Sequence, residues 1–316
     1  MKSRCAIVLP VYNEEAVLPI MVNALGETFA KERYDILIVD DGSSDGTWGI
    51  VKNLAKTRDN IGGLRFTRNF GKESAIGAGL RKAYDMVDSV ACVIVMDADM
   101  QHPVDIALKM YKSWSRGGVD IIEGVKTARQ NESPLRRYGA KLFYKALQTM
   151  AGLNLENASD FKLLDVRVVR EIINMPENQT FFRAMTGWTG LRAQKIYFEP
   201  KERSAGGTKW SLIKLARLAI GSVTAYTSKP LNWVTFAGFG FLAFALLLAL
   251  QTLINYVLGY SVAGFTTVII LLLLIGSVLM ISLGIIGVYI AKIYDEIKAR
   301  PRYIISEALE IRGQKD

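Results

Sequence analysis

A long stretch without charge constrains this chain more than any other feature. From Pro230 to Ala291 the 316-residue sequence has no Asp, Glu, Lys or Arg, although these residues make up 22% of the whole. A helix that crosses a membrane needs about 20 apolar residues. The stretch therefore predicts two membrane-spanning helices, near Trp233–Leu258 and Thr266–Ile290, joined by a short uncharged turn. The alternative, a buried hairpin in a soluble core, lacks comparably apolar sequence elsewhere to surround it.

Basic residues flank the two expected spans and predict their orientation. Before the spans stand Lys209, Lys214, Arg217 and Lys229, and after them Lys292, Lys298, Arg300 and Arg302. By the positive-inside rule, both ends of the pair then lie in the cytoplasm. The apolar run near the N-terminus is too short for a secretory signal. We therefore expect a multi-pass protein of the inner (plasma) membrane, with its first 200 residues and both termini cytoplasmic.

The change in composition predicts four parts. These are a cytoplasmic globular domain (1–208), an interfacial amphipathic helix (209–229), a transmembrane hairpin (230–291) and a cytoplasmic tail (292–316). The interfacial helix rests on WSLIKLARLAIGSVTAY, where apolar residues recur at helical spacing opposite Lys214 and Arg217. The net charge of +9 does not indicate nucleic-acid binding, because no recognition module or stripe of aromatic and basic residues accompanies it. Much of the excess lies beside the spans, as anionic headgroups favour.

Apolar runs of strand length alternate with amphipathic stretches of helix length in the first domain. Strands are expected at Arg4–Leu9, Asp35–Val39, Leu64–Thr67, Ala91–Met96, Ile121–Val125 and Gln194–Phe198. Helices are expected at Glu14–Phe29, Thr47–Thr57, Lys72–Val87, Val104–Arg116, Pro134–Met150 and Val166–Met175. The alternation predicts an α/β fold, a largely parallel sheet with helices on both faces. Ligands of such sheets bind beyond the carboxyl ends of the strands.

Polar residues gather at four of the expected strand ends, namely Pro10–Glu14, Asp40–Ser44, Arg68–Lys72 and Asp97–Gln101. The sequence has neither G-x-G-x-x-G after the first strand nor G-x-x-x-x-G-K-[ST], so the marks of a dinucleotide fold and of a phosphate-loop NTPase are missing. Asp40 and Asp41 could accept hydrogen bonds from a base or a ribose. A plain strand-turn-helix with Asp45 as cap explains part of this segment, but not the two aspartates before it.

Asp97 and Asp99 are a candidate site for Mg²⁺ or Mn²⁺. Side chains two apart on an extended segment point to the same side, and two carboxylates that close require a cation or a proton between them. Mg²⁺ prefers oxygen ligands and commonly uses one or two carboxylates with phosphate oxygens, so Gln101 is a candidate third ligand. In the alternative, Asp97 caps the next helix and Asp99 lies in a solvated turn. His102 is expected to be a surface or helix-start residue rather than a ligand.

Six segments in a fixed order carry a resemblance: PVYNE, DDGSSDGT, RNFGKE, DADMQHP, SDFKLLD and ERSAGGTKW. Together they resemble the family 2 glycosyltransferases of GT-A fold. They are more similar to the polyprenyl-phosphate glycosyltransferases, which include dolichyl-phosphate mannose synthases and bacterial bactoprenol (undecaprenyl-phosphate) glucosyltransferases. The resemblance spans about residues 4–215, and the two spans match the bactoprenol branch. Those relatives usually have an acidic residue where His102 stands. QTFFRAMTGW breaks the Q-x-x-R-W spacing of processive synthases, which favours transfer of a single sugar.

The resemblance implies inverting transfer of a sugar from a nucleotide, with UDP-glucose as the first guess, to a polyprenyl phosphate. It places the nucleotide sugar against Pro10, Tyr12, Glu14, Asp41, Lys72, Asp97, Ala98 and Asp99. It places the catalytic base at Asp160, with orientation of the acceptor or stabilisation of an oxocarbenium-like centre as other roles. The structural alternative for Asp160 is a helix cap, because an apolar run begins at Phe161. The product would serve cell-surface glycosylation, such as lipopolysaccharide modification.

Two anionic substrates need fixed cations, and the sequence offers several. Arg203 is expected to take part in catalysis, and Arg136, Arg137, Lys141 and Lys209 are expected to hold the acceptor phosphate. Spacing gathers the first three of these four on one side of a helix, although a solvated basic face explains that spacing equally well.

Competing functions remain open at this point. One is transfer from GDP-mannose, and another is a membrane-tethered nucleotide-sugar-binding partner of an export complex that has no lipid acceptor. Glycines in the two spans could allow close packing between copies, so a homo-oligomer, with a tetramer as the first guess, is expected.

Overall fold

The computed structural model describes residues 4–86, 90–127, 158–177, 180–199, 229–259 and 264–312. The described residues fall into two compact units. One comprises residues 4–199 together with 301–312, and the other comprises residues 229–300. Each unit is described by itself.

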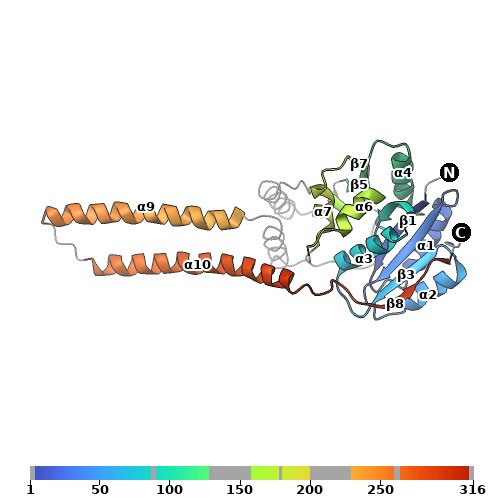
Figure 1. The fold of residues 1–316 in the computed structure, drawn as a ribbon, viewed down its shortest axis with the longest axis horizontal. Helices are drawn as coiled ribbons and strands as arrows, with labels where there is room; N and C mark the ends of the chain where they lie inside the picture. The colour runs from blue at the N-terminus through green and yellow to red at the C-terminus, as the bar shows by residue number, and fades with distance from the viewer. Residues whose placement is uncertain are drawn as a thin grey trace. The chain divides into compact units, whose positions relative to one another are not determined.

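The first unit is built on an eight-stranded sheet (Figure 1). Its strands are β1 (Arg4–Val11), β2 (Tyr34–Asp40), β3 (Ile61–Phe66), β4 (Val90–Val95), β5 (Ile121–Lys126), β6 (Ala158–Asp165), β7 (Ala193–Phe198) and β8 (Ile305–Leu309). The spatial order is β7-β5-β6-β4-β1-β2-β3-β8. The pairs within β3-β2-β1-β4 are parallel, as is β5 with β7, whereas β6 and β8 run antiparallel to their neighbours. The predicted largely parallel α/β sheet is confirmed.

Helices cover both faces of this sheet. They are α1 (Leu18–Thr28), α2 (Thr47–Thr57), α3 (Lys72–Tyr84), α4 (Val104–Ser115), α6 (Val166–Ile173) and α7 (Phe182–Trp188). Apolar side chains of α1, α2 and α4 pack on one face, and those of α3, α6 and α7 pack on the other. Because β1, β2, β3 and β4 are parallel, the loops that follow them lie at the same edge of the sheet.

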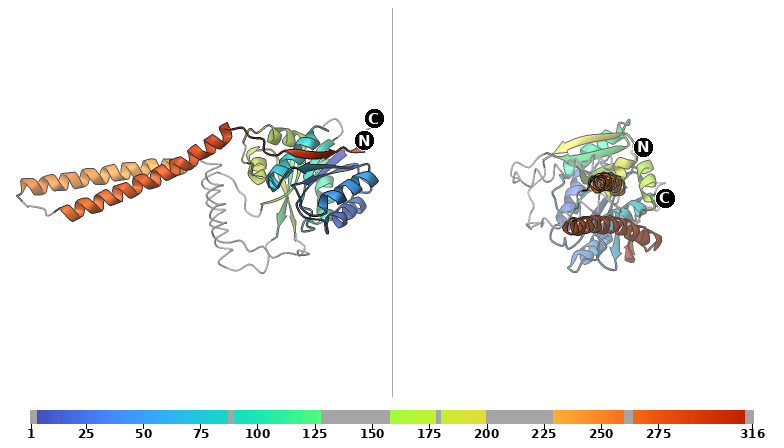
Figure 2. Two further views of the ribbon diagram at one scale, coloured as in Figure 1. Left: turned by 90° about the horizontal axis from the view of Figure 1, so that it is seen from below. Right: turned by 90° about the vertical axis from the view of Figure 1, so that its left-hand side faces the viewer.

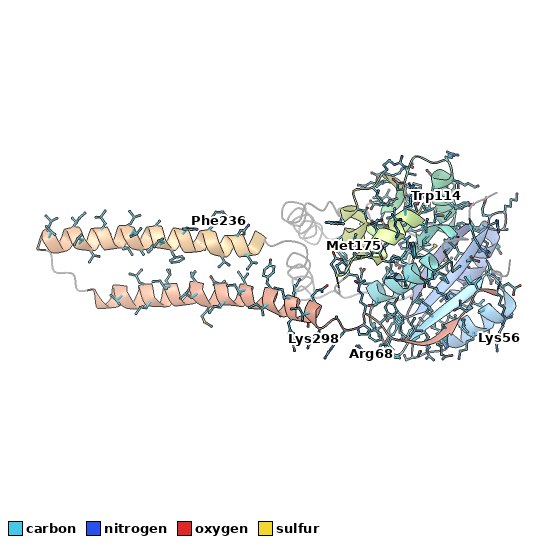
Figure 3. The ribbon with its side chains drawn as sticks, viewed as in Figure 1. Lys56, Arg68, Trp114, Met175, Phe236 and Lys298 are labelled. Carbon is cyan, nitrogen blue, oxygen red and sulfur yellow. The ribbon has the colours of Figure 1, made fainter. Side chains whose placement is uncertain are left out.

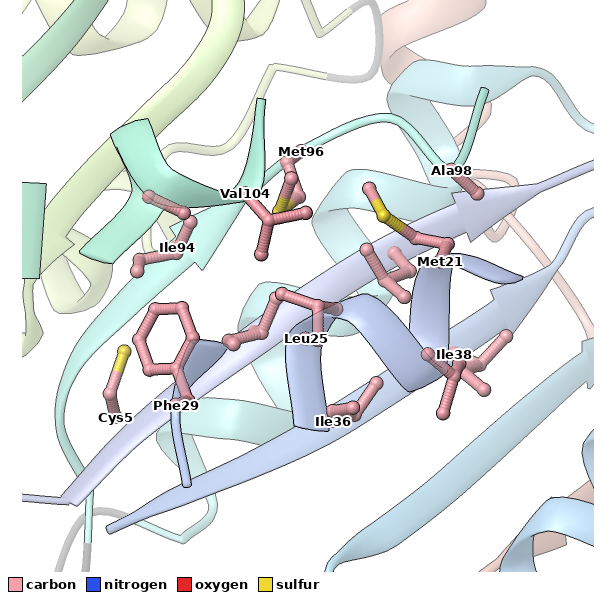
Figure 4. Packing of buried hydrophobic residues seen from close by; sticks show 14 of the residues in the cluster. Cys5, Met21, Leu25, Phe29, Ile36, Ile38, Ile94, Met96, Ala98 and Val104 are labelled. Atoms are coloured by element: carbon pink, nitrogen blue, oxygen red, sulfur yellow. The ribbon is translucent and has the colours of Figure 1, made fainter. Parts of the chain in front are cut away.

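The two cores follow from the strand period of two. In β1, Ile7 and Leu9 point into the core under α1, which Figure 4 shows around Leu25 and Phe29. Val8 points into the other core, under α3. Here α3 lies so close to β1 that a Cβ added at Gly79 would come within 2.3 Å of the Val8 side chain.

Two of the expected elements of this unit begin more than one residue away from the predicted start. The helix expected from Glu14 starts at Leu18. Pro19 stands at the start of that helix, where its missing N–H is tolerated. Strand β3 starts at Ile61, three residues before the expected Leu64, because glycines that resemble a loop lie inside the strand. A Cβ at Gly63 would meet the Val51 side chain at 2.8 Å, so helix α2 leaves no room for a side chain.

Three elements of this unit were not expected at all: β6, α7 and β8. The sequence predicted only a tail after residue 291, but β8 pairs with β3 there. Glu307 of β8 pairs with Lys52 at 2.6 Å. An edge strand that carries charge has a weak apolar pattern, which explains why it was missed.

The second unit contains α9 (Lys229–Val257) and α10 (Phe265–Ile297), which run antiparallel (Figures 1 and 2). By length and composition, Phe236–Asn255 and Leu274–Ile297 are apolar enough to cross a membrane. Apolar side chains such as Phe236, which is 71% exposed, point outwards from these helices (Figure 3). The predicted helix pair is confirmed. Its topology stays a prediction. The expected helix at 134–150 lies outside the described residues, as does the expected helix at 209–229 except for Lys229, which begins α9.

Candidate functional site: four charged side chains beyond the strand ends

The loops after β1 and β2 are tied together by polar side chains. Asn13, with a left-handed φ of 55°, accepts a hydrogen bond from the backbone N–H of Ser44 at 2.9 Å. Its own N–H donates to Ser43 Oγ at 2.9 Å. The N–H of Glu14 donates to Thr47 Oγ1 at 2.9 Å. Tyr12 and Glu14, which are predicted to bind the nucleotide sugar, belong to this first loop. The loop is therefore held against the DDGSSDGT segment.

Asp41 ties the end of β2 to the loop after β3. Its Oδ1 accepts the N–H of Phe70 at 2.7 Å, and its Oδ2 accepts that of Gly71 at 2.9 Å. Burial raises the pKa of Asp41, and these N–H groups lower it in part. Gly71 has a φ of +97°, which favours glycine. Asp41 therefore fixes the turn that directly precedes Lys72, the first residue of α3. The predicted contact of Asp41 with the nucleotide stays a prediction.

Lys72 joins the ends of β3, β4 and β6. Its Nζ lies 2.5 Å from Asp97 Oδ1 and 2.7 Å from Asp160 Oδ2. Burial would lower the pKa of Lys72, but the two carboxylates outweigh it and raise the pKa. Lys72 is therefore held as a cation between two of the predicted site residues.

Asp160 is buried in β6 and accepts from two cations. Besides Lys72, Arg183 donates from Nε to Oδ1 at 2.7 Å and from a terminal nitrogen to Oδ2 at 3.1 Å. Burial raises the pKa of Asp160, but Arg183 and Lys72 outweigh it and hold the pKa well below its usual range. We name Lys72, Asp97, Asp160 and Arg183 the Asp160 cluster. Its central carboxylate is ionised and is a weak proton acceptor.

The helix-cap alternative for Asp160 is wrong, because this residue lies inside a strand. The residue that caps the following helix is Asp165, whose side chain accepts the N–H of Arg167 at 3.0 Å. The apolar run after Asp160 therefore belongs to β6 and not to a helix.

Arg183 is a candidate site residue that the sequence did not reveal. It lies on the short helix α7, which two further contacts hold in place. Glu73 Oε2 accepts the N–H of Phe182 at 2.8 Å, and the buried Lys162 donates to Thr186 Oγ1 at 2.6 Å. The available signal in the sequence is the single arginine of QTFFRAMTGW, the segment whose spacing differs from the Q-x-x-R-W motif.

His102 is a buried scaffold residue that directly precedes Pro103, the N-cap of α4, so of the two predicted positions the helix start fits and the surface does not. It is 1% exposed, and its Nδ1 accepts the N–H of Asp97 at 3.0 Å. Its ring stacks on Phe161 with centroids 4.7 Å apart. Burial is the main cause that lowers the pKa of His102 to about 4, so the ring is neutral at pH 7. His102 thus links the backbone at Asp97 to the residue next to Asp160.

The residues after Asp97 have features that fit a divalent cation. The N–H of Gln101 donates to Asp99 Oδ1 at 3.1 Å, and Met100 between them has a φ of 61°, a strained conformation typical of functional loops. Gln101 is 5% exposed, and its Nε2 has no hydrogen-bond partner among the described residues. Turning the amide would present Oε1 instead.

Among the residues that the structure describes, no three His, Cys, Asp or Glu side chains converge as a metal site. The candidate ligands are therefore two carboxylates and one amide, a set that suits Mg²⁺ when phosphate oxygens complete the shell. The helix-cap alternative for Asp97 is not supported, because α4 has Pro103 at its N-cap and no side-chain cap.

The remaining predicted residues differ in what they can contribute. Tyr12 is 47% exposed beyond β1, and Pro10 lies at the end of that strand. The Ala98 side chain packs in the apolar core, so only its backbone could meet a ligand (Figure 4). Arg136, Arg137, Lys141, Arg203 and Lys209 lie outside the described residues, and their roles stay predictions.

Comparison with known proteins identifies the family. Residues 6–173 match the model of glycosyl transferase family 2. The chain belongs to this family. A bactoprenol glucosyl transferase of Shigella phage SfX is 33% identical over 306 residues, which cover 96% of this chain and 98% of that protein. An uncharacterized glycosyltransferase of Synechocystis sp. is 34% identical over 314 residues, which cover 97% and 96%. The family 2 glycosyltransferase described here is therefore similar to such proteins along almost its whole length.

Among solved structures, glucosyl-3-phosphoglycerate synthase of Mycobacterium tuberculosis resembles this glycosyltransferase with a TM-score of 0.49 and 15% identity. The match covers 72% of this chain and 81% of that chain. Family membership and the sheet confirm the predicted GT-A fold class and the enzyme class.

Proposed function

We propose that this glycosyltransferase moves a single sugar from a nucleotide sugar, first of all UDP-glucose, to undecaprenyl phosphate or another polyprenyl phosphate. The product would be a lipid-linked sugar, formed with inversion at the cytoplasmic face of the plasma membrane. The Asp160 cluster carries this proposal, because it sets two fixed cations beside the D-x-D segment. Relatives named bactoprenol glucosyl transferase, and two helices that could cross a membrane, support the lipid acceptor.

The charge state of Asp160 favours a mechanism without a strong general base. A phosphate monoester has a second pKa near 6, so the acceptor is mostly a dianion at cytoplasmic pH. Its oxygen attacks the anomeric carbon, the bond from that carbon to the diphosphate breaks, and the electron pair leaves with the nucleoside diphosphate. No proton has to be removed. In this proposal Asp160 holds Lys72 and Arg183 where they face the phosphates, and so acts as a positioning residue.

Asp97, Asp99 and Gln101 would hold Mg²⁺ or Mn²⁺. The ion would act as a Lewis acid that stabilises the charge on the departing diphosphate. His102 fixes the backbone at Asp97, so its neutral ring supports this site without adding charge.

A donor panel tests the proposal. The purified membrane protein is incubated with Mg²⁺, undecaprenyl phosphate and labelled UDP-glucose, UDP-galactose, UDP-N-acetylglucosamine or GDP-mannose, and labelled lipid is extracted. We expect labelled lipid with UDP-glucose, and none when the lipid phosphate is left out. Product from GDP-mannose alone would correct the donor. Bound nucleotide sugar without lipid product under all conditions would favour the tethered binding module and overturn the proposal.

A further inference from the structure

A cavity of about 300 Å³ lies beside the Asp160 cluster, within the first unit. It is a partly open cavity lined by residues of α3, of α7, of the end of α6 and of the segment 301–303. Its apolar lining consists of Ile76, Leu80, Ile172, Ile173, Phe182 and Met185. This volume is at the lower end of the range for small-molecule sites.

Two residues that line the cavity are direct sequence neighbours of the two cations of the Asp160 cluster. Glu73 and Phe182 line the cavity, and the N–H of Phe182 donates to Glu73 Oε2 at 2.8 Å. Lys72 precedes Glu73, and Arg183 follows Phe182, and both of these cations bind Asp160. A ligand whose charged end faces the cations could therefore place its next atoms in the cavity.

The polar residues around the cavity are compatible with an anionic amphiphile. Arg81 donates to the backbone O of Ile173 at 3.1 Å, and Arg302 donates to that of Met175 at 2.9 Å. These contacts fix two cations at the cavity wall. Burial, together with the charge of Asp160, raises the pKa of Glu73 to about 7, although the Phe182 N–H, Arg183 and Lys72 oppose this. Its neutral form is then well populated near pH 7 and tolerates an apolar neighbour.

We infer that this cavity binds the first isoprene units of the lipid acceptor, the part next to the phosphate. The inference rests on the proposed function and adds a site for the lipid chain. An isoprene unit is apolar, and the cavity offers it an apolar lining in which Phe182 directly precedes Arg183 of the Asp160 cluster in the sequence. The wall segment that begins at Pro301 also follows α10, which ends at Ile297, in the sequence. The cavity wall is thus in covalent continuity with a helix that could cross a membrane.

Gly77→Leu tests the inference, because Gly77 lines the cavity and a Cβ there would meet nothing within 4 Å. Leucine also favours a helix interior over glycine. We expect the KM for undecaprenyl phosphate to rise about tenfold, as when a pocket loses room for a few methylenes. Gly77→Ala should give a smaller rise. The KM for the nucleotide sugar, and the slow hydrolysis of the nucleotide sugar without acceptor, should not change.

Gly49→Leu is the matched control, because Gly49 lies within α2 and a Cβ there also meets nothing within 4 Å. It should leave both KM values unchanged. An unchanged acceptor KM in Gly77→Leu overturns the inference. An equal loss of acceptor transfer and nucleotide-sugar hydrolysis also overturns it, since the cavity would then matter only for the fold. If the unaltered chain makes no lipid product with any donor, the proposed function fails, and the inference fails with it.

Discussion

Two aspartates in this protein have nearly the same surroundings and, by our argument, different tasks. Asp160 is 6% exposed and accepts from Lys72 and Arg183, whereas Asp120 is 4% exposed and accepts from Arg167 and Arg192. Asp165 completes the second group, which we name the Asp120 cluster, just as Asp97 completes the first. Each cluster pairs two carboxylates with two cations.

The two clusters differ in place and in the exposure of their cations. The register of Val95 with Lys162 puts Asp160 just past the carboxyl end of β4, whereas Asp120 directly precedes β5. Arg167 and Arg192 are each 64% exposed, against 40% for Lys72 and 31% for Arg183. The ion pairs of the two arginines therefore resemble surface salt bridges, which contribute little. The number of ion pairs therefore does not mark a site. Position beyond the parallel strand ends, beside a D-x-D segment, distinguishes the Asp160 cluster.

Asparagine substitution at both aspartates should separate the clusters most clearly. In Asp160→Asn, Lys72 and Arg183 lose their shared counter-ion, and we expect transfer to fall about 10³-fold, as when preorganised charge is lost. Asp120→Asn should keep transfer near that of the unaltered chain and lower the free energy of unfolding by at most about 1 kcal/mol, because the ion pairs that it loses are made by exposed arginines. Labelled-lipid assays measure transfer, and thermal unfolding in detergent measures the change in stability. If Asp160→Asn and Asp120→Asn lowered transfer equally, the two clusters would not differ in function.

Asp99→Asn should have the next largest effect. Loss of one carboxylate from the candidate ion site should lower transfer about a hundredfold at low Mg²⁺, because charge on the departing diphosphate is less well stabilised. Additional Mg²⁺ should recover part of this loss. Asp105→Asn is the control, since Asp105 is an exposed carboxylate on α4 that pairs with Lys109. Full activity of Asp99→Asn at all Mg²⁺ concentrations would contradict the assignment.

Lysine in place of one arginine in each cluster, Arg183 or Arg192, sharpens the comparison further. Arg183 makes a two-point contact with Asp160, which lysine cannot reproduce. Loss of one charge-assisted hydrogen bond, about 1.5–3 kcal/mol, predicts a fall in transfer of about ten- to a hundredfold. Arg192→Lys changes an equivalent contact to Asp120 and should leave transfer unchanged. A similar fall in both variants would mean that the substitution acts through folding alone.

Glu73 should give the smallest effect, which depends on pH. Its folded pKa of about 7 lies above its ordinary 4.5, so the folded state binds the proton more tightly. The stability from Glu73 is then lost as the pH rises from about 4.5 to 7, by about 1–3 kcal/mol. Glu73→Gln cannot ionise, so its melting temperature relative to the unaltered chain should rise between pH 5 and 7.5. For Asp160 the effect of pH on stability is opposite. Its pKa is lowered in the folded state, so its ionised carboxylate stabilises the fold at pH values above the ordinary pKa of an aspartate, and this stability is lost as the pH falls. A pH-independent difference for Glu73→Gln would contradict the burial argument.

Much of this site could be predicted from the sequence, because parallel strands deliver their carboxyl ends to one edge. Lys72, Asp97 and Asp160 were selected in this way or by family resemblance, and the structure brings all three together. Arg183 could not be found, since its approach to Asp160 depends on how α7 docks on β6, a long-range contact without a local signal. The burial of His102 could not be predicted for a similar reason. Its burial comes from Phe161, and nothing near it in the sequence indicates that contact.

Strand β8 has a consequence for how the chain is made. It pairs with β3, yet α9 and α10 lie between the two strands in the sequence. A ribosome therefore finishes both apolar helices before the partner of β3 emerges. Until then the nascent sheet has an open edge, which is a ready template for mispairing. Closure of the sheet is thus tied to completion of translation, and a chain cut short after α10 would present that edge to proteases and chaperones.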